Sequence, residues 1–266
     1  MMRHFAWALL LLLGVSAARA QKSYLGFDQN LYPGDAALTK LHRTFSYACY
    51  WLNNPPQMNT NPWTGKRGLL RAQGFGFLLL FNGRLDAQLK GRDATTLGGA
   101  DGAAAVKAAL DEGFPMRAVI FLDQEEGGRM LPEQAAYLRG WIDAVRRGGF
   151  RAGVYCSGIS VPEGDGSIST AQDVHHQFPK AALWVANDAC PPSPGCRLRA
   201  APPAGSGFAG AEVWQFAQSP RRPQYTAACV KTYSADGNCY APGLPQTAQS
   251  LLDLDTAASA DPSAGR

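Results

Sequence analysis

Eight short apolar segments recur along this chain, and the first five are each followed by a stretch with the pattern of a helix. Most of these segments are continuous apolar runs, which are typical of parallel strands buried on both faces. They span residues 24–28, 46–51, 75–82, 117–123, 150–156, 182–187, 211–217 and 251–255. Eight such strands restrict the fold more than any other feature of the sequence.

The helix-like stretches decide how these strands are connected. They span residues 36–43, 65–73, 102–112, 132–147 and 170–178, and the pattern stops after the sixth strand. Repeated β–α units in 266 residues favour a closed barrel or a doubly wound sheet. No GxGxxG motif opens a helix after the first strand, which argues against a dinucleotide-binding fold. We therefore expect an α/β fold, a single TIM-type barrel of eight strands with helices mainly after the first five.

Both ends of the chain lie outside the expected barrel at 21–255. Residues 1–20 combine a weakly positive start, an apolar run over 5–15 and a small-x-small site at Ala18-Arg19-Ala20. This layout is typical of a cleaved secretory signal peptide, so we expect a secreted or periplasmic protein. No later stretch has the ~20 apolar residues that a membrane-spanning helix needs. The small residues of 256–266 predict a disordered tail.

Charge and cysteine content narrow the class of protein. The balance of 25 Lys+Arg against 21 Asp+Glu is too mild to predict nucleic-acid binding. Six cysteines behind a signal peptide predict disulfides. Local spacing favours Cys190–Cys196 and Cys229–Cys239, which leaves Cys49 with Cys156. No CxxC or histidine-rich spacing supports the rival metal site, and no metal is expected.

Acidic residues cluster at the ends of three of the expected strands. Asp28 ends the first strand, Asp123 and Glu125 end the fourth, and Asp253 and Asp255 lie in the last. In an α/β barrel the chemistry lies at the carboxyl ends of the strands. If the fourth strand continues through "FLDQE", Asp123 and Glu125 point to the same side. Such a pair repels its ionised forms, so one member could keep a proton and act as a general acid. The alternative is a solvated polar loop.

Aromatic residues near the same strand ends favour a sugar cleft. Flat rings with a polar edge suit sugar faces, although single rings are also common in cores. The candidates for lining the cleft are Tyr50, Tyr155, Trp184, Trp214 and Gln215.

Several of these motifs occur in the order found in a known family. "GFDQNLYPG", "IFLDQE", "GFRAGVYCSG", "LWVAND", "EVWQFA" and "LLDLD" resemble strand ends of family 25 lysozymes. The stretch "YWLNNPP" with "WTGKRGLLRAQGFGFLLLFNG" resembles more closely a related group of secreted glycoside-hydrolase-like barrels of unknown function. The resemblance implies that Glu125 is the general acid and that Asp123 and Asp28 are supporting carboxylates. It also implies that Asp255, or less plausibly Asp253, is the closing acid.

The leading functional hypothesis is a secreted glycosidase acting on peptidoglycan or a related amino-sugar polymer. Its expected partner is that polysaccharide, with no cofactor, no nucleic acid, no membrane insertion and a monomeric state. A catalytically inactive carbohydrate-binding barrel is the alternative, because a fold alone does not guarantee activity. A serine hydrolase has less support, since no GxSxG motif occurs and His175-His176 falls on an expected helix.

Overall fold

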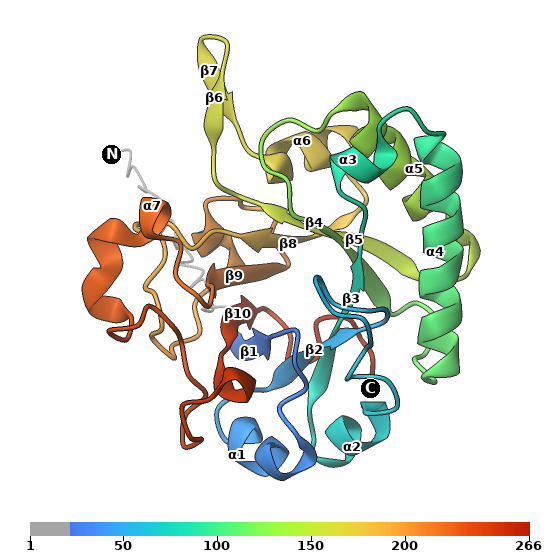
Figure 1. Ribbon diagram of the computed structural model, residues 1–266. Helices are drawn as coiled ribbons and strands as arrows, with labels where there is room; N and C mark the ends of the chain where they lie inside the picture. Colours follow the sequence, from blue (N-terminus) through green and yellow to red (C-terminus); the bar gives the residue numbers. More distant parts are fainter. Residues whose placement is uncertain (1–21) are drawn as a thin grey trace, which may run out of the picture.

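Eight strands close into a barrel in the computed structural model, which describes residues 22–266 (Figure 1). The strand order around the barrel is β1-β10-β9-β8-β5-β4-β3-β2. This confirms the expected fold, while the signal-peptide prediction for residues 1–20 lies outside the described residues. The strands are β1 (Tyr24–Asp28), β2 (Tyr47–Trp51), β3 (Gly76–Asn82), β4 (Val119–Gln124), β5 (Arg151–Ser157), β8 (Ala182–Ala186), β9 (Val213–Ala217) and β10 (Asp253–Ala257).

The last strand runs in the opposite direction to the other seven. β10 pairs antiparallel with both β1 and β9, whereas the remaining barrel pairs are parallel. In the β1–β10 register, Asp28 lies opposite Asp253 and Gly26 lies opposite Asp255. The start of β10 is therefore at the mouth, where the other strands end, and its later residues lie deeper.

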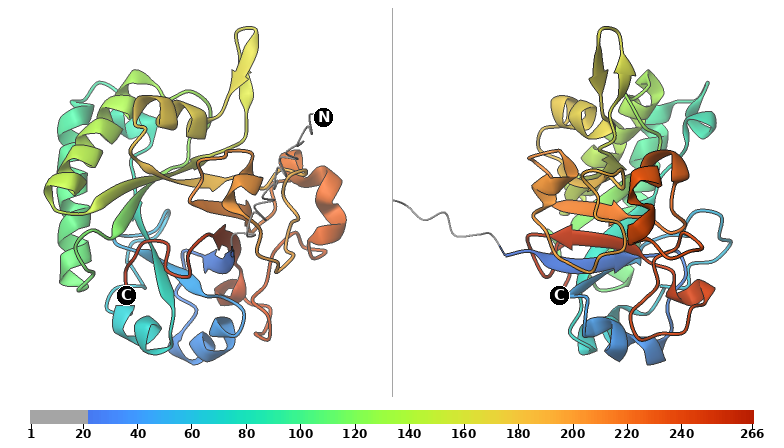
Figure 2. Two further views of the ribbon diagram at one scale, coloured as in Figure 1. Left: turned by 180° about the vertical axis from the view of Figure 1, so that it is seen from behind. Right: turned by 90° about the vertical axis from the view of Figure 1, so that its left-hand side faces the viewer.

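Helices cover the outside of the barrel mainly between β1 and β8, as expected. Figures 1 and 2 show α4 and α5 together on one side of the barrel, with the turn-rich segments that follow β8 on the other. None of the helices in 22–266 combines the length and apolar character needed to cross a membrane. The helices are η1 (Asp35–Ala37), α1 (Leu38–His42), α2 (Arg67–Ala72), α3 (Asp86–Leu89), α4 (Ala94–Asp111), α5 (Pro132–Arg147), α6 (Thr170–Gln177), η2 (Pro203–Ser206), α7 (Pro223–Thr226), η3 (Ala227–Thr232) and η4 (Ala248–Ser250).

Helix α4 begins eight residues before the expected start at residue 102. Its N-cap is Asp93, whose side chain accepts a hydrogen bond from the Thr96 N–H at 3.0 Å. Glycines in both helices allow close packing of α4 on α5. A Cβ on Gly98 would lie 2.0 Å from the Tyr137 carbonyl oxygen, and one on Gly140 would lie 2.2 Å from that of Thr95. Glycine at these crossings therefore reflects helix contact rather than a turn.

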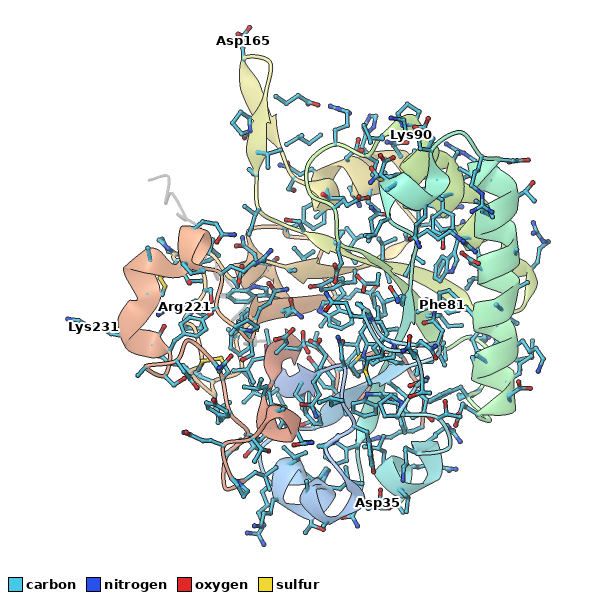
Figure 3. The ribbon with its side chains drawn as sticks, in the orientation of Figure 1. Asp35, Phe81, Lys90, Asp165, Arg221 and Lys231 are labelled. Atoms are coloured by element: carbon cyan, nitrogen blue, oxygen red, sulfur yellow. A yellow bond between two sulfur atoms is a disulfide. The ribbon has the colours of Figure 1, made fainter. Side chains whose placement is uncertain are left out.

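A hairpin that the sequence analysis missed projects from the barrel between β5 and α6. Its strands are β6 (Val161–Glu163) and β7 (Gly166–Ile168), and Asp165 lies at its tip (Figure 3). Arg129 holds its base, donating to Glu163 at 2.5 and 2.8 Å and to the buried Asp173 at 3.1 Å.

The C-terminal residues are ordered against the bottom of the barrel, so the expectation of a disordered tail over 256–266 is corrected. Residues 256 and 257 complete β10. The Asp261 carboxylate accepts from the Phe77 N–H at 2.8 Å, and the buried Ser263 hydroxyl accepts from the Leu79 N–H at 2.9 Å. Ser263 also exchanges backbone hydrogen bonds with Phe77 and Val119. The tail thereby bridges the starts of β3 and β4.

The disulfides join loops that are distant in sequence, and all three expected pairings are wrong. The bonds are Cys190–Cys229 and Cys196–Cys239, in the part of the chain that carries Arg221 and Lys231 (Figure 3). The 188–197 segment runs beside 229–239 instead of closing on itself, as the backbone bond from Cys196 to Thr232 shows.

Cys49 and Cys156 are both buried and free. Cys49 lies on the inward face of β2, close enough to Asp28 and Asp255 to interact electrostatically. Cys156 follows the inward-facing Tyr155, and because strand side chains alternate it points toward the helices. Opposite faces of the barrel wall keep the two thiols apart.

Candidate active site

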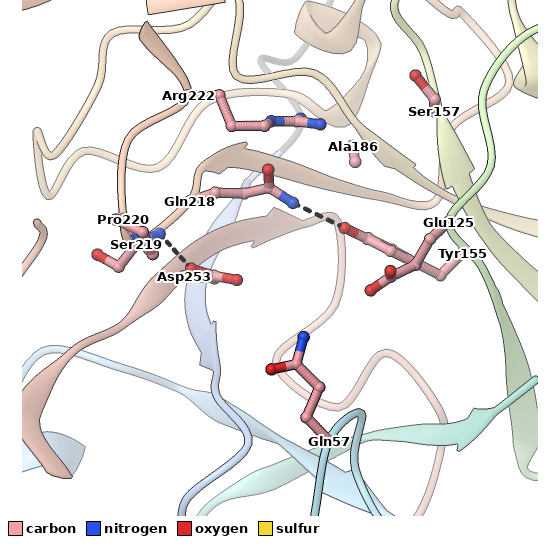
Figure 4. A pocket seen from close by; sticks show the side chains of 10 residues that line it. All are labelled: Gln57, Glu125, Tyr155, Ser157, Ala186, Gln218, Ser219, Pro220, Arg222 and Asp253. Atoms are coloured by element: carbon pink, nitrogen blue, oxygen red, sulfur yellow. Dashed lines mark hydrogen bonds between the residues drawn. The ribbon is translucent and has the colours of Figure 1, made fainter. Parts of the chain in front are cut away.

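The mouth of the barrel contains a polar cavity of about 500 Å³ (Figure 4). A deeper cavity of about 200 Å³ adjoins it and shares Gln57, Glu125, Tyr155, Gln218 and Asp253 with it. Asp28, Asp123, Trp184 and Gln215 line the deeper cavity. The carboxyl ends of the strands thus bring together the acids of β1, β4 and β10, as the barrel geometry predicts.

Glu125 and Asp123 lie at different depths of this site. β4 ends at Gln124, so Glu125 follows the strand and is exposed, whereas Asp123 is buried. Burial raises the pKa of Glu125; Arg222 lowers it and Glu126 raises it. The pKa of Asp123 is raised well above its usual range by burial and by the charges of Glu125 and Asp28. Its Oδ1 has no hydrogen-bond partner among the described residues.

Glu126 faces away from the cavity. Its carboxylate accepts from the Asp86 N–H at 2.9 and 3.1 Å and from the Gln134 amide. It therefore links the starts of α3 and α5.

Asp28 is held by a network of amide and hydroxyl groups. The Gln215 amide donates to Asp28 at 2.9 Å, and the Tyr155 hydroxyl donates to the Gln215 carbonyl oxygen at 2.8 Å. Gln218 donates to both Tyr155 and Gln215. Burial raises the pKa of Asp28 to about 6, and the bond from Gln215 opposes this rise. With a pKa of about 6, Asp28 is largely ionised at neutral pH.

The structure reverses the expected order of the two acids of β10. Asp253 lines the cavity and accepts from the Ser219 N–H at 2.5 Å. Asp255 is fully buried below it, beside Asp28, and accepts from the Trp184 indole N–H at 3.0 Å. Burial and the charge of Asp28 raise the pKa values of Asp253 and Asp255 well above the usual range of an aspartic acid. Because β10 is antiparallel, the earlier of its two acids reaches the mouth.

Two aromatic residues expected in the cleft lie outside the barrel instead. Tyr50 packs against Phe77 and Phe114 under the helices, and its hydroxyl accepts from the Lys66 N–H at 3.2 Å. The Trp214 ring lies under Gly205, and its N–H donates to the Asn187 carbonyl at 3.0 Å. Strand alternation explains both positions. Trp51 and Gln215 point into the barrel, so their chain neighbours Tyr50 and Trp214 point outward.

The cavity residues that were not identified from the sequence include three with long polar side chains, namely Gln57, Gln218 and Arg222. All three lie in loops, where periodicity gives no signal. Arg222 donates to both oxygens of the buried Asp188, at 2.7 and 3.2 Å, which fixes the plane of its guanidinium.

This arrangement suits acid–base chemistry on a neutral polar ligand. Glu125 presents a carboxyl with a raised pKa at the cavity surface, and Asp28 offers a second carboxyl that ionises more readily than its buried neighbours. Trp184 and Tyr155 form an aromatic wall with ring centroids 4.7 Å apart. Within 22–266, no group of three or more His, Cys, Asp or Glu side chains has the arrangement of a metal site.

Comparison with known proteins identifies both a family and a fold. The family model described as "Rv2525c-like, glycoside hydrolase-like domain" matches residues 49–195, which is over half of the chain. No curated protein matches the chain in sequence.

Solved structures with the same fold share little sequence with this chain. An uncharacterized protein from B. stearothermophilus is 18% identical with a TM-score of 0.55, and the match covers 88% of this chain and 95% of that one. The Mycobacterium tuberculosis Tat-secreted protein Rv2525c is 12% identical with a TM-score of 0.51, covering 88% and 93%. The modular autolysin LytC from Streptococcus pneumoniae is 10% identical with a TM-score of 0.51, covering 88% and 46%.

Proposed function

The chain belongs to the Rv2525c-like, glycoside hydrolase-like family, and from this premise we propose that it is a secreted enzyme that hydrolyses glycosidic bonds. The observation that carries the proposal is the position of Glu125, a carboxyl with a raised pKa at the surface of a polar cavity floored by further acids. Glycoside hydrolysis requires a protonated acid beside the leaving oxygen and a carboxylate near the anomeric carbon.

In the proposed reaction Glu125 gives its proton to the glycosidic oxygen as the bond to the anomeric carbon breaks. A water then adds its hydroxyl to that carbon, and the proton of the water passes to a carboxylate of the site. Asp28, whose pKa is about 6, is the acid that most readily carries a negative charge near the positive charge that develops on the sugar. Asp123 also lines the deeper cavity and interacts electrostatically with both acids, and its Oδ1, which has no partner among the described residues, is available to orient the substrate or a water. Tyr155 lines both cavities, packs edge-on against the buried Trp184, and is held through its hydroxyl by Gln215 and Gln218, so it is the ring available to contact a sugar.

Peptidoglycan or a related amino-sugar polymer is the proposed substrate. The pneumococcal structural neighbour is an autolysin and the mycobacterial one is a Tat-secreted protein, which makes cell-wall glycan the first substrate to test. The two disulfides support an oxidising compartment outside the cytoplasm.

The test is release of new reducing ends from purified peptidoglycan by the wild type, by Glu125→Gln and by Glu126→Gln. Removing a general acid is expected to lower the rate by about 10²- to 10⁴-fold. Glu126→Gln is the matched control, because its amide oxygen still accepts from the Asp86 N–H and its side chain lies outside the cavity. Equal release by the wild type and Glu125→Gln would refute the assigned role. Retention of the glycan without turnover by the wild type would identify a sugar-binding barrel instead.

A further inference from the structure

Gln57 lies where three cavities of the barrel mouth meet. It lines the cavity of about 500 Å³, the deeper one of about 200 Å³ and a third of about 270 Å³ on the other side of Glu125. Glu125 is the other residue common to all three. A polymer that crosses the mouth past Glu125 therefore also passes Gln57.

The backbone at Gln57 adopts a conformation that favours glycine. Its φ is 63°, in the left-handed region, which is uncommon for a residue with a Cβ. Such strain is characteristically found at functional sites, where the surrounding structure imposes it. Glycine would relieve the strain, so a glutamine here indicates that its side chain is used.

Asparagine side chains fix the loop on both sides of Gln57. Asn30 donates to the Pro56 carbonyl at 3.3 Å, Asn54 donates to the Asn59 carbonyl at 3.0 Å, and Asn82 donates to the Asn54 carbonyl at 2.9 Å. These bonds tie the loop to the ends of β1 and β3. The position of Gln57 over the mouth is therefore set before any ligand arrives.

The Gln57 amide points into the cavity (Figure 4). No described residue forms a hydrogen bond with it. A carboxamide offers a donor and an acceptor at a fixed separation. Pro56, Leu80 and Trp51 add apolar surface beside it in the deeper cavity. A ligand group that matches this set has an N–H, a carbonyl and a small apolar end.

We propose that Gln57 binds the acetamido group of an N-acetylated sugar, donating its amide N–H to the carbonyl oxygen of that group. The proposal rests on the proposed function and specifies its substrate class. It makes Gln57 the residue that distinguishes 2-acetamido sugars from sugars with a 2-hydroxyl group, because an amide left unpaired in the complex penalises the wrong sugar.

The experiment measures binding of chitotetraose and cellotetraose, two neutral β-1,4 chains that differ in the 2-substituent. All proteins carry Glu125→Gln to suppress turnover, and Gln57→Gly, Gln57→Ala and Asn59→Ala are compared in that background. Asn59→Ala is the matched control in the same loop, because its backbone carbonyl still accepts from Asn54. Thermal unfolding of each variant accompanies the binding measurement.

With Gln57 present, chitotetraose is expected to bind about fivefold more tightly than cellotetraose, since one hydrogen bond distinguishes them. Gln57→Gly and Gln57→Ala should both lose this preference without a fall in melting temperature, and Asn59→Ala should keep it. If Gln57→Gly lost the preference for chitotetraose while Gln57→Ala kept it, the effect would come from the loop backbone and the proposal would be overturned. Equal affinity for the two sugars, or binding of neither, would also overturn it. An acetamido preference without turnover of peptidoglycan by the Glu125-containing protein would refute the proposed function and leave this inference standing.

Discussion

Gln215 on β9 donates a hydrogen bond of 2.9 Å to Asp28 on β1, across 187 residues of sequence and beneath the mouth of the barrel. The same amide accepts from Tyr155 on β5. One side chain thereby sets the orientation of the carboxylate that we assign to charge stabilisation and of the ring that lines the cavity.

Replacing Gln215 by leucine should change how activity depends on pH. Asp28 would lose the hydrogen bond that lowers its pKa, so it would ionise only at a higher pH. We expect kcat/KM to fall by roughly 10- to 100-fold, with the acidic limb of its pH profile displaced upward. Gln218→Leu is the control, because Gln218 contacts Tyr155 and Gln215 but not Asp28. An acidic limb that stays in place in Gln215→Leu would contradict the assignment.

The buried acids should make the folded protein more stable in mildly acidic solution. Burial raises the pKa of Asp28 from its ordinary value of 3.8 to about 6, so the folded state retains a proton that the unfolded state has lost. Asp28 contributes up to about 3 kcal/mol to the free energy of unfolding. This contribution is fully present below pH 4 and is lost as the pH rises through 6. Thermal unfolding of the wild type and Asp28→Asn at several pH values checks this. A slope between pH 4 and 6 that is identical in both proteins would refute it.

Cysteine chemistry should distinguish four bonded residues from two free ones. Peptide mapping is expected to find Cys190 joined to Cys229 and Cys196 joined to Cys239. A thiol reagent should label Cys49 and Cys156 in denaturant but not in the native protein, because both are buried and burial raises the pKa of each thiol. Any mapped bond between Cys49 and Cys156 would contradict the placement of the two on opposite faces of the wall.

The C-terminal segment should contribute to stability through Ser263. Ser263→Ala leaves the N–H of Leu79 without its acceptor in a buried position, which costs about 1–3 kcal/mol. Ser259→Ala, at an exposed contact with the Asp261 N–H, is expected to cost much less. Denaturant unfolding measures both changes, and equal costs would show that the segment does not stabilise β3.

The barrel could be predicted from the sequence because its eight strands are continuous apolar runs, which leave few alternative arrangements. The acids at the strand ends follow from the same reasoning, and the structure brings Asp28, Asp123 and Glu125 to one mouth. Whether β10 runs parallel or antiparallel to its neighbours could not be predicted in this way, because a run of apolar residues looks the same for either strand direction. That one reversal exchanged the positions of Asp253 and Asp255.

Side-chain alternation explains two other errors. Tyr50 and Trp51 cannot both face inward, and neither can Trp214 and Gln215, but an apolar run does not show which member of a pair does. The disulfides and Gln57 depend on how loops that are distant in sequence meet. Local spacing favoured Cys190 with Cys196, and the loop that carries Gln57 is positioned by Asn30, which precedes it by 27 residues.

The reversed last strand also determines how this protein can be attached to a support. Because β10 starts at the mouth, the chain leaves the barrel at the bottom, where Asp261 and Ser263 contact β3. Coupling to a resin through a linker added after Arg266 would therefore leave the cavity open to solution. A protein immobilised in this way should keep its cavity accessible to a large insoluble polymer, whereas coupling through Asp165 would attach the support to the hairpin that follows β5, whose last residue lines the cavity.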